Sequence, residues 1–234
     1  MGDRLIHEIL PVGLLQCNCS IVGDPGTREA VVIDPGDEID RIREALERHR
    51  LRVRAIVCTH AHIDHVGGLA KLHRATGAPV VMHASDLELY LALPSQAEWL
   101  GIEPPEMTEV EGFLSDGDEL RWGELQAQVI HTPGHSRGSL SLYLAAAAPG
   151  PPPAPAGTTT GAPLLETPRL FAGDTLFAGS IGRTDLWGGS FSEILRSIHQ
   201  KLLVLPEDTI VYPGHGASTT IAREKQTNPF LRLA

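Results

Sequence analysis

The order of apolar and polar residues predicts short strands that alternate with amphipathic helices. Strands are expected where short apolar runs end at turn-forming residues, over residues 5–10, 19–23, 29–33, 53–58, 80–82, 119–122, 125–130, 140–144, 169–172 and 209–212. Helices are expected where apolar residues recur every three or four positions, over residues 37–50, 66–75, 84–93, 191–203 and 218–226. A turn is expected around Pro11, Val12 and Gly13, while Pro and Gly interrupt residues 94–118, which receive no assignment.

The strands fall into two sets, and helices follow each set. This rhythm predicts a sandwich of two sheets with helices outside, formed by residues 1–234 as one domain. The hydrophobic fraction of 42% suffices for the core of such a domain. Residues 145–168 are a low-complexity run of Ala, Pro, Gly and Thr that cannot bury a core. We expect a flexible insertion in a hairpin there and assign it no function.

Charge and composition exclude several classes of protein. A net charge of −10 argues against sequence-independent binding to DNA or RNA, although a small anionic substrate remains possible. No run approaches the ~18 apolar residues of a membrane span, and residues 1–5 lack the features of a signal peptide. The cysteines Cys17, Cys19 and Cys58 do not form a disulfide framework. We therefore expect a cytoplasmic protein without membrane association.

Residues 59–68, with the sequence THAHIDHVGG, carry the densest chemistry of the chain. The side chains of His60, His62, Asp64 and His65 offer the nitrogen and oxygen ligands that borderline divalent metals prefer. On an extended chain the first three share one face, and the turn into the following helix would bring His65 to a neighbouring position. Because the side chains point in two directions, two metals are favoured over one. The alternative is a His-rich surface loop.

Three later positions share one local pattern, in which a strand ends, a glycine follows and a potential metal ligand comes next. These positions are His135 in TPGHS, Asp174 in AGDTLF and His215 in YPGHG. Glycine permits close backbone approach or a positive φ, which directs one side chain toward a shared point above the sheet edges. Together with residues 59–68 they supply five histidines and two aspartates, enough for two metals.

The order and spacing of these seven side chains resemble the pattern of metal ligands in the metallo-β-lactamase fold superfamily of hydrolases. The resemblance extends over the whole chain apart from residues 145–168. It implies an α/β (α+β) fold, a four-layer αββα sandwich, with the metals at the edge between the sheets. The ligands it implies are His60, His62 and His135 for the first metal, and Asp64, His65 and His215 for the second, with Asp174 bridging both.

Within that superfamily the chain is similar to glyoxalase II-like thioester hydrolases, above all their short bacterial relatives. The segments that carry this similarity are NCSIV at 18–22, IDPG at 33–36, GSIGRTD at 179–185, TTI at 219–221 and NPF at 228–230. Glyoxalase II proper continues into a helical C-terminal region that supplies much of its glutathione contact, whereas this sequence ends soon after Phe230. The resemblance thus implies the metals more strongly than the substrate.

The implied activity is hydrolysis of a small-molecule thioester, such as S-lactoylglutathione, by a monomer or homodimer. The hypothesis places a shared hydroxide between two divalent metals, with zinc expected and iron or manganese as alternatives. Asp64 and Asp174 are the catalytic candidates, and Asp64 would orient the hydroxide. Arg183 is the candidate for a substrate carboxylate, with a plain surface arginine as the alternative. Asp34 is either a partner of a ligand imidazole or a turn residue.

Two other enzyme classes remain open on the same fold. The resemblance also extends to sulfur dioxygenases acting on glutathione persulfide, in which one iron would use His60, His135 and Asp174. Gly36 and Gly216 argue against that class, and a lactonase is a further possibility. Among the remaining residues, the tryptophans at 99, 122 and 187 are expected in packing, with the last at the mouth of the site. The histidines at 83 and 131 are expected at its rim at best.

Overall fold

A computed structural model describes residues 5–146 and 165–232, which form two stacked six-stranded sheets. The strands of the first sheet are, in spatial order, β1 (Ile6–Val12), β2 (Cys17–Gly23), β3 (Glu29–Ile33), β4 (Arg52–Val57), β5 (Val80–Met82) and β6 (Gly112–Phe113). Those of the second are β14 (Thr219–Thr220), β13 (Ile210–Pro213), β10 (Arg169–Gly173), β9 (Leu140–Leu144), β8 (Leu125–His131) and β7 (Glu119–Trp122). The strands β11 (Leu176–Phe177) and β12 (Ser180–Ile181) form a separate hairpin.

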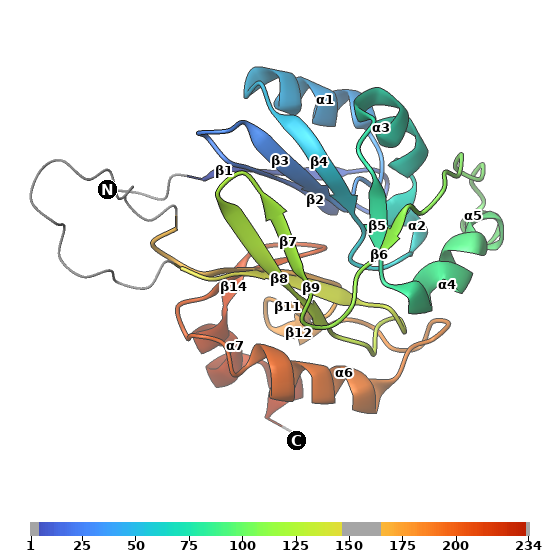
Figure 1. The fold of residues 1–234 in the computed structure, drawn as a ribbon. Coiled ribbons are helices and arrows are strands. Elements are labelled where there is room, and N and C mark those ends of the chain that lie inside the picture. The colour runs from blue at the N-terminus through green and yellow to red at the C-terminus, as the bar shows by residue number, and fades with distance from the viewer. Residues whose placement is uncertain (1–4, 147–164, 233–234) are drawn as a thin grey trace, which may run out of the picture.

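Helices cover the outer face of each sheet (Figure 1). Those on the side of the first sheet are α1 (Ile39–Arg48), α2 (Ile63–Val66), α3 (Leu69–Thr76), η1 (Ala84–Asp86), α4 (Leu87–Leu91) and α5 (Leu93–Leu100). Those on the side of the second are α6 (Phe191–Ser197), η2 (Ile198–Leu202), α7 (Ile221–Thr227) and η3 (Pro229–Leu231). The order of layers confirms the predicted αββα sandwich.

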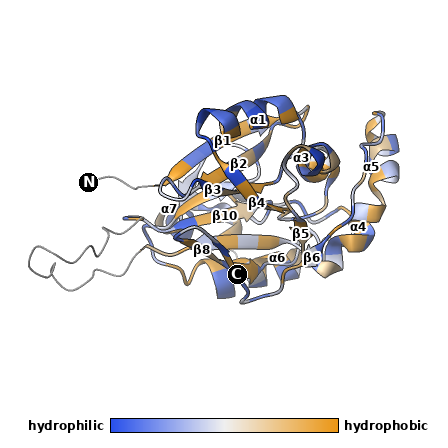
Figure 2. Ribbon diagram, turned by 45° about the horizontal axis from the view of Figure 1, so that its top comes forward, coloured by the Kyte–Doolittle hydropathy of each residue, from blue (hydrophilic) through white to orange (hydrophobic). Residues whose placement is uncertain are grey.

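Apolar side chains fill three layers, because successive residues of a strand point to opposite faces of its sheet. In β3, Val31 and Ile33 face the second sheet, while Val32 faces the helices together with Ile42 of α1. Figure 2 shows the hydrophilic faces of the outer helices turned away from the sheets. Ile42 is fully buried, and burying a side chain of this size contributes about 1.5–3 kcal/mol.

The turn predicted around Pro11, Val12 and Gly13 is wrong in its position. Strand β1 continues through Pro11, which lies opposite Asn18, and the chain turns only at residues 13–16. Proline is tolerated there because β1 is an edge strand, paired on one side only, so the missing N–H need not cost a ladder bond. Gly13 has a φ of 68°, which fits the turn.

Several helices also differ from their predicted bounds. The helix expected over 66–75 is divided into α2 and α3, and the one over 84–93 into η1 and α4. Helix α5 occupies the unassigned region, where Pro94 lies in its first turn and so breaks no helical hydrogen bond. The helix over 191–203 finishes in the π-helical turn η2. The short strands β6, β11, β12 and β14 were not predicted, since two residues carry no readable periodicity.

Strands β9 and β10, on either side of the Ala/Pro-rich run, pair antiparallel with Arg169 opposite Leu144. The predicted flexible insertion falls largely on residues 147–164, outside the described residues. Within residues 5–146 and 165–232, every helix is too short or too polar to cross a bilayer.

Parallel pairing brings the potential metal ligands to one edge of the sandwich. Strand β4 pairs parallel with β3 and β5, and β13 with β10, so their carboxyl ends lie together. The residues directly after these ends include Asp34, His60, Asp174 and His215. The predicted extended run through Asp64 is wrong, because α2 begins at Ile63 and places Asp64 on a helix.

The loop after β3 packs directly against α2. A Cβ atom on Gly36 would lie 1.6 Å from the backbone oxygen of Asp64, and one on Gly67 would lie 2.7 Å from the backbone oxygen of Gly36. Two backbones in such close contact leave no room for a side chain. Glycine at position 36 therefore fixes where α2 lies.

We expect Gly36→Ala to lower the free energy of unfolding by about 1–3 kcal/mol, because the added methyl group overpacks this contact. Urea denaturation measures the effect. Gly26→Ala is the control, since its Cβ would approach only a side-chain oxygen of Asp24, at 3.3 Å. Equal stability of the two variants would contradict the assigned role of Gly36.

Candidate metal centre

The seven predicted ligands converge at the edge between the two sheets. Four of them follow β4, in the loop and in α2. The other three follow strands β8, β10 and β13 of the second sheet, each directly after a glycine. Two of those glycines, Gly134 and Gly173, have positive φ values of 135° and 47°. The third, Gly214, has no space for a Cβ atom, which would lie 2.2 Å from Asp174 Oδ1.

The first group contains three ring nitrogens. His135 Nε2 lies 3.2 Å from His60 Nε2 and 2.9 Å from His62 Nδ1. Nitrogen ligands around one tetrahedral zinc ion, at ~2.0–2.1 Å from the metal, are about 3.3 Å apart. The spacing in this group therefore suits one shared ion.

Hydrogen bonds fix the tautomers of two of these rings. The Nδ1 atom of His135 lies 2.8 Å from the backbone oxygen of Arg183, which only accepts, so Nδ1 donates. The hydroxyl of Thr59 donates to Asp34 and is 3.2 Å from Nδ1 of His60, from which its oxygen can accept. In neutral rings both Nε2 atoms then carry lone pairs that face each other. A cation between them would satisfy both lone pairs.

The second group combines two histidines with carboxylates. His215 Nε2 lies 3.2 Å from His65 Nε2 and 3.1 Å from Asp64 Oδ2. Asp174 lies between the two groups, because its Oδ2 is 3.7 Å both from His135 Nε2 and from His215 Nε2. Its Oδ1 is buried and has no hydrogen-bond partner among the described residues. A carboxylate oxygen without a hydrogen bond at this point fits a site for cations.

Asp34 contacts the far side of the second group, as one of the two alternatives proposed. Its Oδ2 lies 3.0 Å from Nδ1 of His65, which leaves Nε2 of that ring facing Asp64 and Asp174. The same carboxylate accepts hydrogen bonds from the backbone N–H and the hydroxyl of Thr59. Its φ of 52° is unusual for a residue other than glycine and belongs to this arrangement.

The electrostatic field favours neutral imidazoles at His60 and His62 and a positive charge at His65. Burial and the neighbouring rings lower the pKa of His60 well below its usual value and that of His62 to about 3. Burial opposes the charged form of His65 as well, but Cys17 and the carboxylates of Asp174 and Asp64 raise its pKa well above the usual value. A bound cation would supply the same positive charge.

Asp86 is a residue of the site that the sequence did not reveal. Its buried carboxylate accepts hydrogen bonds from the backbone N–H of Ala61 at 3.0 Å and from the hydroxyl of Ser136 at 2.8 Å. It also accepts one from the backbone N–H of Gly138 at 2.6 Å. One carboxylate thus joins the loop between His60 and His62 to the loop that carries His135. An Asp at the start of a helix gives no signal of this role.

The other predicted residues lie in or near an adjoining cavity. Arg183, Trp187 and Trp99 line this cavity. The prediction that Trp99 packs in the interior is wrong, because this residue is 72% exposed. The rings of His83 and His131 are not among the lining residues and stack on each other 4.0 Å apart. The three cysteines are buried and free, as expected.

A sandwich of this kind, with histidine and aspartate side chains that could hold metal ions at the edge between its sheets, is the architecture of the metallo-hydrolases. The chain belongs to the metallo-β-lactamase superfamily, whose sequence model matches residues 12–147 and 149–215. It is 34% identical over 231 residues to the hydroxyacylglutathione hydrolase GloC of Haemophilus influenzae, covering 96% of this chain and 97% of that protein.

Several solved structures share this fold at more than 25% identity. The BLEG-1 B3 metallo-β-lactamase is 36% identical with a TM-score of 0.82, covering 97% of this chain and 99% of that one. TTHA1623 in a di-iron-bound form is 36% identical with a TM-score of 0.76, covering 96% and 100%. ETHE1 from Myxococcus xanthus is 29% identical with a TM-score of 0.74, covering 96% and 83%.

We expect Asp86→Asn to lower the free energy of unfolding by about 2–4 kcal/mol. The amide nitrogen of asparagine is itself a hydrogen-bond donor, so it cannot accept the hydrogen bonds that the carboxylate accepts here. Zinc affinity should fall about 10- to 100-fold, as for other residues that orient metal ligands. Denaturation and competition with a chromogenic chelator measure the two effects. The exposed Asp40→Asn is the control, and a variant that matches it in both assays would contradict the role of Asp86.

Proposed function

We propose that this protein hydrolyses small-molecule thioesters, with glutathione thioesters such as S-lactoylglutathione as the first candidates. The observation that carries the proposal is the position of Asp174 between two donor groups, 3.7 Å from a nitrogen of each. This arrangement suits two divalent cations side by side. The similarity to the hydroxyacylglutathione hydrolase of H. influenzae supports the choice of a thioester.

When bound, two divalent cations lower the pKa of a water molecule toward neutrality and polarise a carbonyl group. Zinc is the metal we propose, and histidine with carboxylate ligands also accepts iron or manganese. The first group, His60, His62 and His135, would hold one ion. The second, Asp64, His65 and His215, would hold the other, with Asp174 in reach of both.

The protein's own contribution is to orient the attacking water. Burial would raise the pKa of Asp64, but His65 and His215 lower it, so this side chain is a carboxylate at neutral pH. Asp64 also lines the cavity, where it can accept a hydrogen bond from a water molecule and direct the oxygen lone pair at the substrate. The water oxygen then bonds to the acyl carbon, the carbon–sulfur bond breaks, and a carboxylic acid and a thiol result.

The chemistry of the leaving group explains why no strong general acid is needed. A thiolate is stable near neutral pH, since thiol pKa values lie near 8.5, whereas an amide leaving group requires a proton. The described residues that line the cavity contain no lysine or cysteine, and its carboxylates belong to the proposed metal ligands. A thioester therefore suits this site better than an amide.

Two alternatives use the same edge of the fold. His60, His135 and Asp174 also lie close enough for one iron, and the similarity to ETHE1 keeps a persulfide dioxygenase as the second candidate. A lactonase is the third. We favour the thioesterase because Asp64, His65 and His215 would have no ligand role around a single iron.

The deciding experiment follows the loss of thioester absorbance when purified protein of known metal content meets S-lactoylglutathione under nitrogen. Turnover without oxygen, with about two metals per chain, supports the proposal. Absence of turnover with about one iron per chain, together with oxygen uptake on glutathione persulfide, would assign the dioxygenase. Absence of turnover with two metals would direct the search to lactones and other esters.

We expect His215→Ala to reduce the metal content from about two ions to about one. It should reduce kcat/KM at least about 100-fold, because a missing ion removes roughly 3 kcal/mol of transition-state stabilisation. Metal analysis and thioester hydrolysis measure the two effects. His73→Gln, on α3 and away from the cavity, is the matched control. Full metal content with full activity would show that His215 is no ligand.

Arg183 lines the cavity, and its guanidinium forms two 2.7 Å hydrogen bonds to Asp185. A substrate carboxylate would have to share this group, so the gain from binding it is modest. We expect Arg183→Ala to raise KM for S-lactoylglutathione about five-fold with kcat unchanged, equivalent to about 1 kcal/mol. Arg196→Ala, exposed on α6, is the control. An unchanged KM would remove this role from Arg183.

A further inference from the structure

The cavity beside the metal ligands is much larger than a lactoyl group and has mainly apolar walls. It has a volume of about 840 Å³, and His62, Asp64, His135, Asp174 and His215 lie at its base. Its apolar walls include Leu15, Leu89, Trp99, Phe177, Leu186 and Trp187. A group bound at the metal ligands therefore lies next to an apolar surface.

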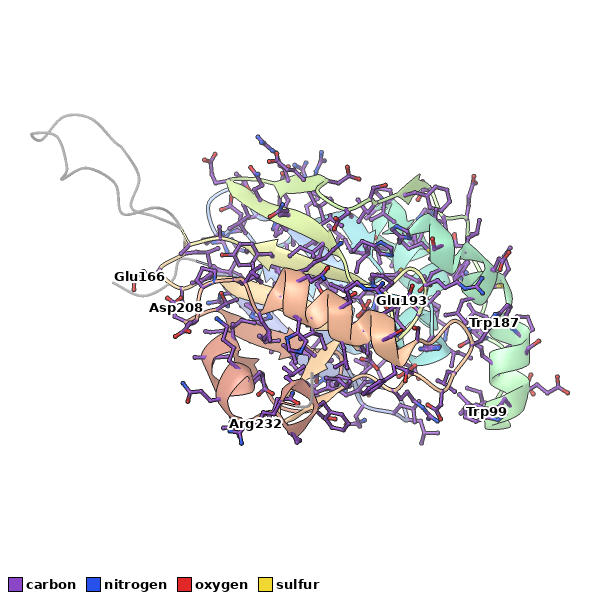
Figure 3. All side chains as sticks on the ribbon, turned by 90° about the horizontal axis from the view of Figure 1, so that it is seen from below. Trp99, Glu166, Trp187, Glu193, Asp208 and Arg232 are labelled. Carbon is purple, nitrogen blue, oxygen red and sulfur yellow. The ribbon has the colours of Figure 1, made fainter. Side chains whose placement is uncertain are left out.

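The two tryptophans lie at the open end of this cavity and come from opposite halves of the molecule. Trp99 belongs to α5, beside the first sheet, and Trp187 to the loop before α6, beside the second (Figure 3). Trp99 is 72% exposed and Trp187 is 57% exposed, while Leu15 from the β1–β2 turn is 46% exposed. Large apolar side chains gathered at one exposed site commonly mark a place where an apolar ligand binds.

The walls of the cavity offer few cationic side chains for a ligand's carboxylates. Among the described lining residues, Arg183 is the only lysine or arginine. Its guanidinium already donates two hydrogen bonds to the carboxylate of Asp185. Glutathione carries two carboxylates, so the lysine and arginine side chains of the walls provide little affinity for it. Most of the binding free energy must come from the apolar walls.

We propose that the preferred substrates are thioesters with an apolar acyl group of about four to eight carbons, or an aromatic one, bound between Trp99 and Trp187. This inference rests on the proposed thioesterase function. The carbonyl would lie at the metal ligands and the acyl chain along the apolar walls. A lactoyl group, with one methyl and one hydroxyl, would leave most of those walls in contact with water. Its hydroxyl would gain no hydrophobic stabilisation from them.

Binding of thioethers tests the pocket apart from catalysis, because a thioether has no carbonyl to hydrolyse. Dissociation constants for S-methyl-, S-butyl- and S-hexylglutathione are measured by calorimetry on the metal-loaded protein. Each buried methylene should tighten binding about two- to three-fold, so the hexyl compound, with five more methylenes, should bind roughly 30- to 240-fold more tightly than the methyl compound. Equal affinity across the series would overturn the inference.

Variants of the two tryptophans locate the effect. We expect Trp99→Ala and Trp187→Ala to weaken binding of S-hexylglutathione at least ten-fold and that of S-methylglutathione less than two-fold. Phe113→Ala is the matched control, because Phe113 is 50% exposed and is absent from the lining of this cavity. If both tryptophan variants bind the hexyl compound like the control, the acyl group does not lie between them and the inference is wrong.

Hydrolysis of S-hexanoylglutathione and S-lactoylglutathione separates this inference from the proposed function. A higher kcat/KM for the hexanoyl compound, by about ten-fold or more, supports both. Hydrolysis with equal or lower kcat/KM for the hexanoyl compound keeps the thioesterase and refutes the apolar preference. Graded thioether binding with no hydrolysis of either thioester refutes the thioesterase, while the pocket keeps its assigned chemistry.

Discussion

The carboxylate of Asp34 is the constraint on which the site depends. It accepts hydrogen bonds from the backbone and the hydroxyl of Thr59 and lies 3.0 Å from Nδ1 of His65. Through the Thr59 hydroxyl it also sets the tautomer of His60. A single buried side chain at the end of β3 thus orients one imidazole in each donor group. The strained φ of Asp34 is the local cost of placing that carboxylate beneath both rings.

Much of the architecture could be predicted because the apolar layers leave a clear periodicity. Strands that face two apolar layers, such as β3, β5 and β9, are continuous apolar runs bounded by turn residues, and their bounds were predicted to the residue. The seven donor residues were also recognisable, since histidines beside glycines at strand ends have few structural uses. The structure brings all seven together, although their binding of metal remains a proposal.

The remaining features depend on contacts between segments that are distant in sequence. Asp86 joins two loops whose contact residues, Ala61 and Ser136, are 75 positions apart along the chain (136 − 61). No local pattern distinguishes it from an ordinary residue at a helix start. The apolar walls of the cavity combine α5 with a loop of the other half, so the exposure of Trp99 follows only from the assembled fold. Asp64 was assigned to an extended run because α2 has just four residues, too few for a helical period.

Each donor group takes side chains from both halves of the sandwich. In the first, His60 and His62 follow β4 of one sheet, and His135 follows β8 of the other. An ion held in such a group is also a cross-link between the sheets, and its binding free energy becomes part of the folding free energy. The cell's supply of metal would then govern how long the protein survives proteolysis, in addition to how fast it works.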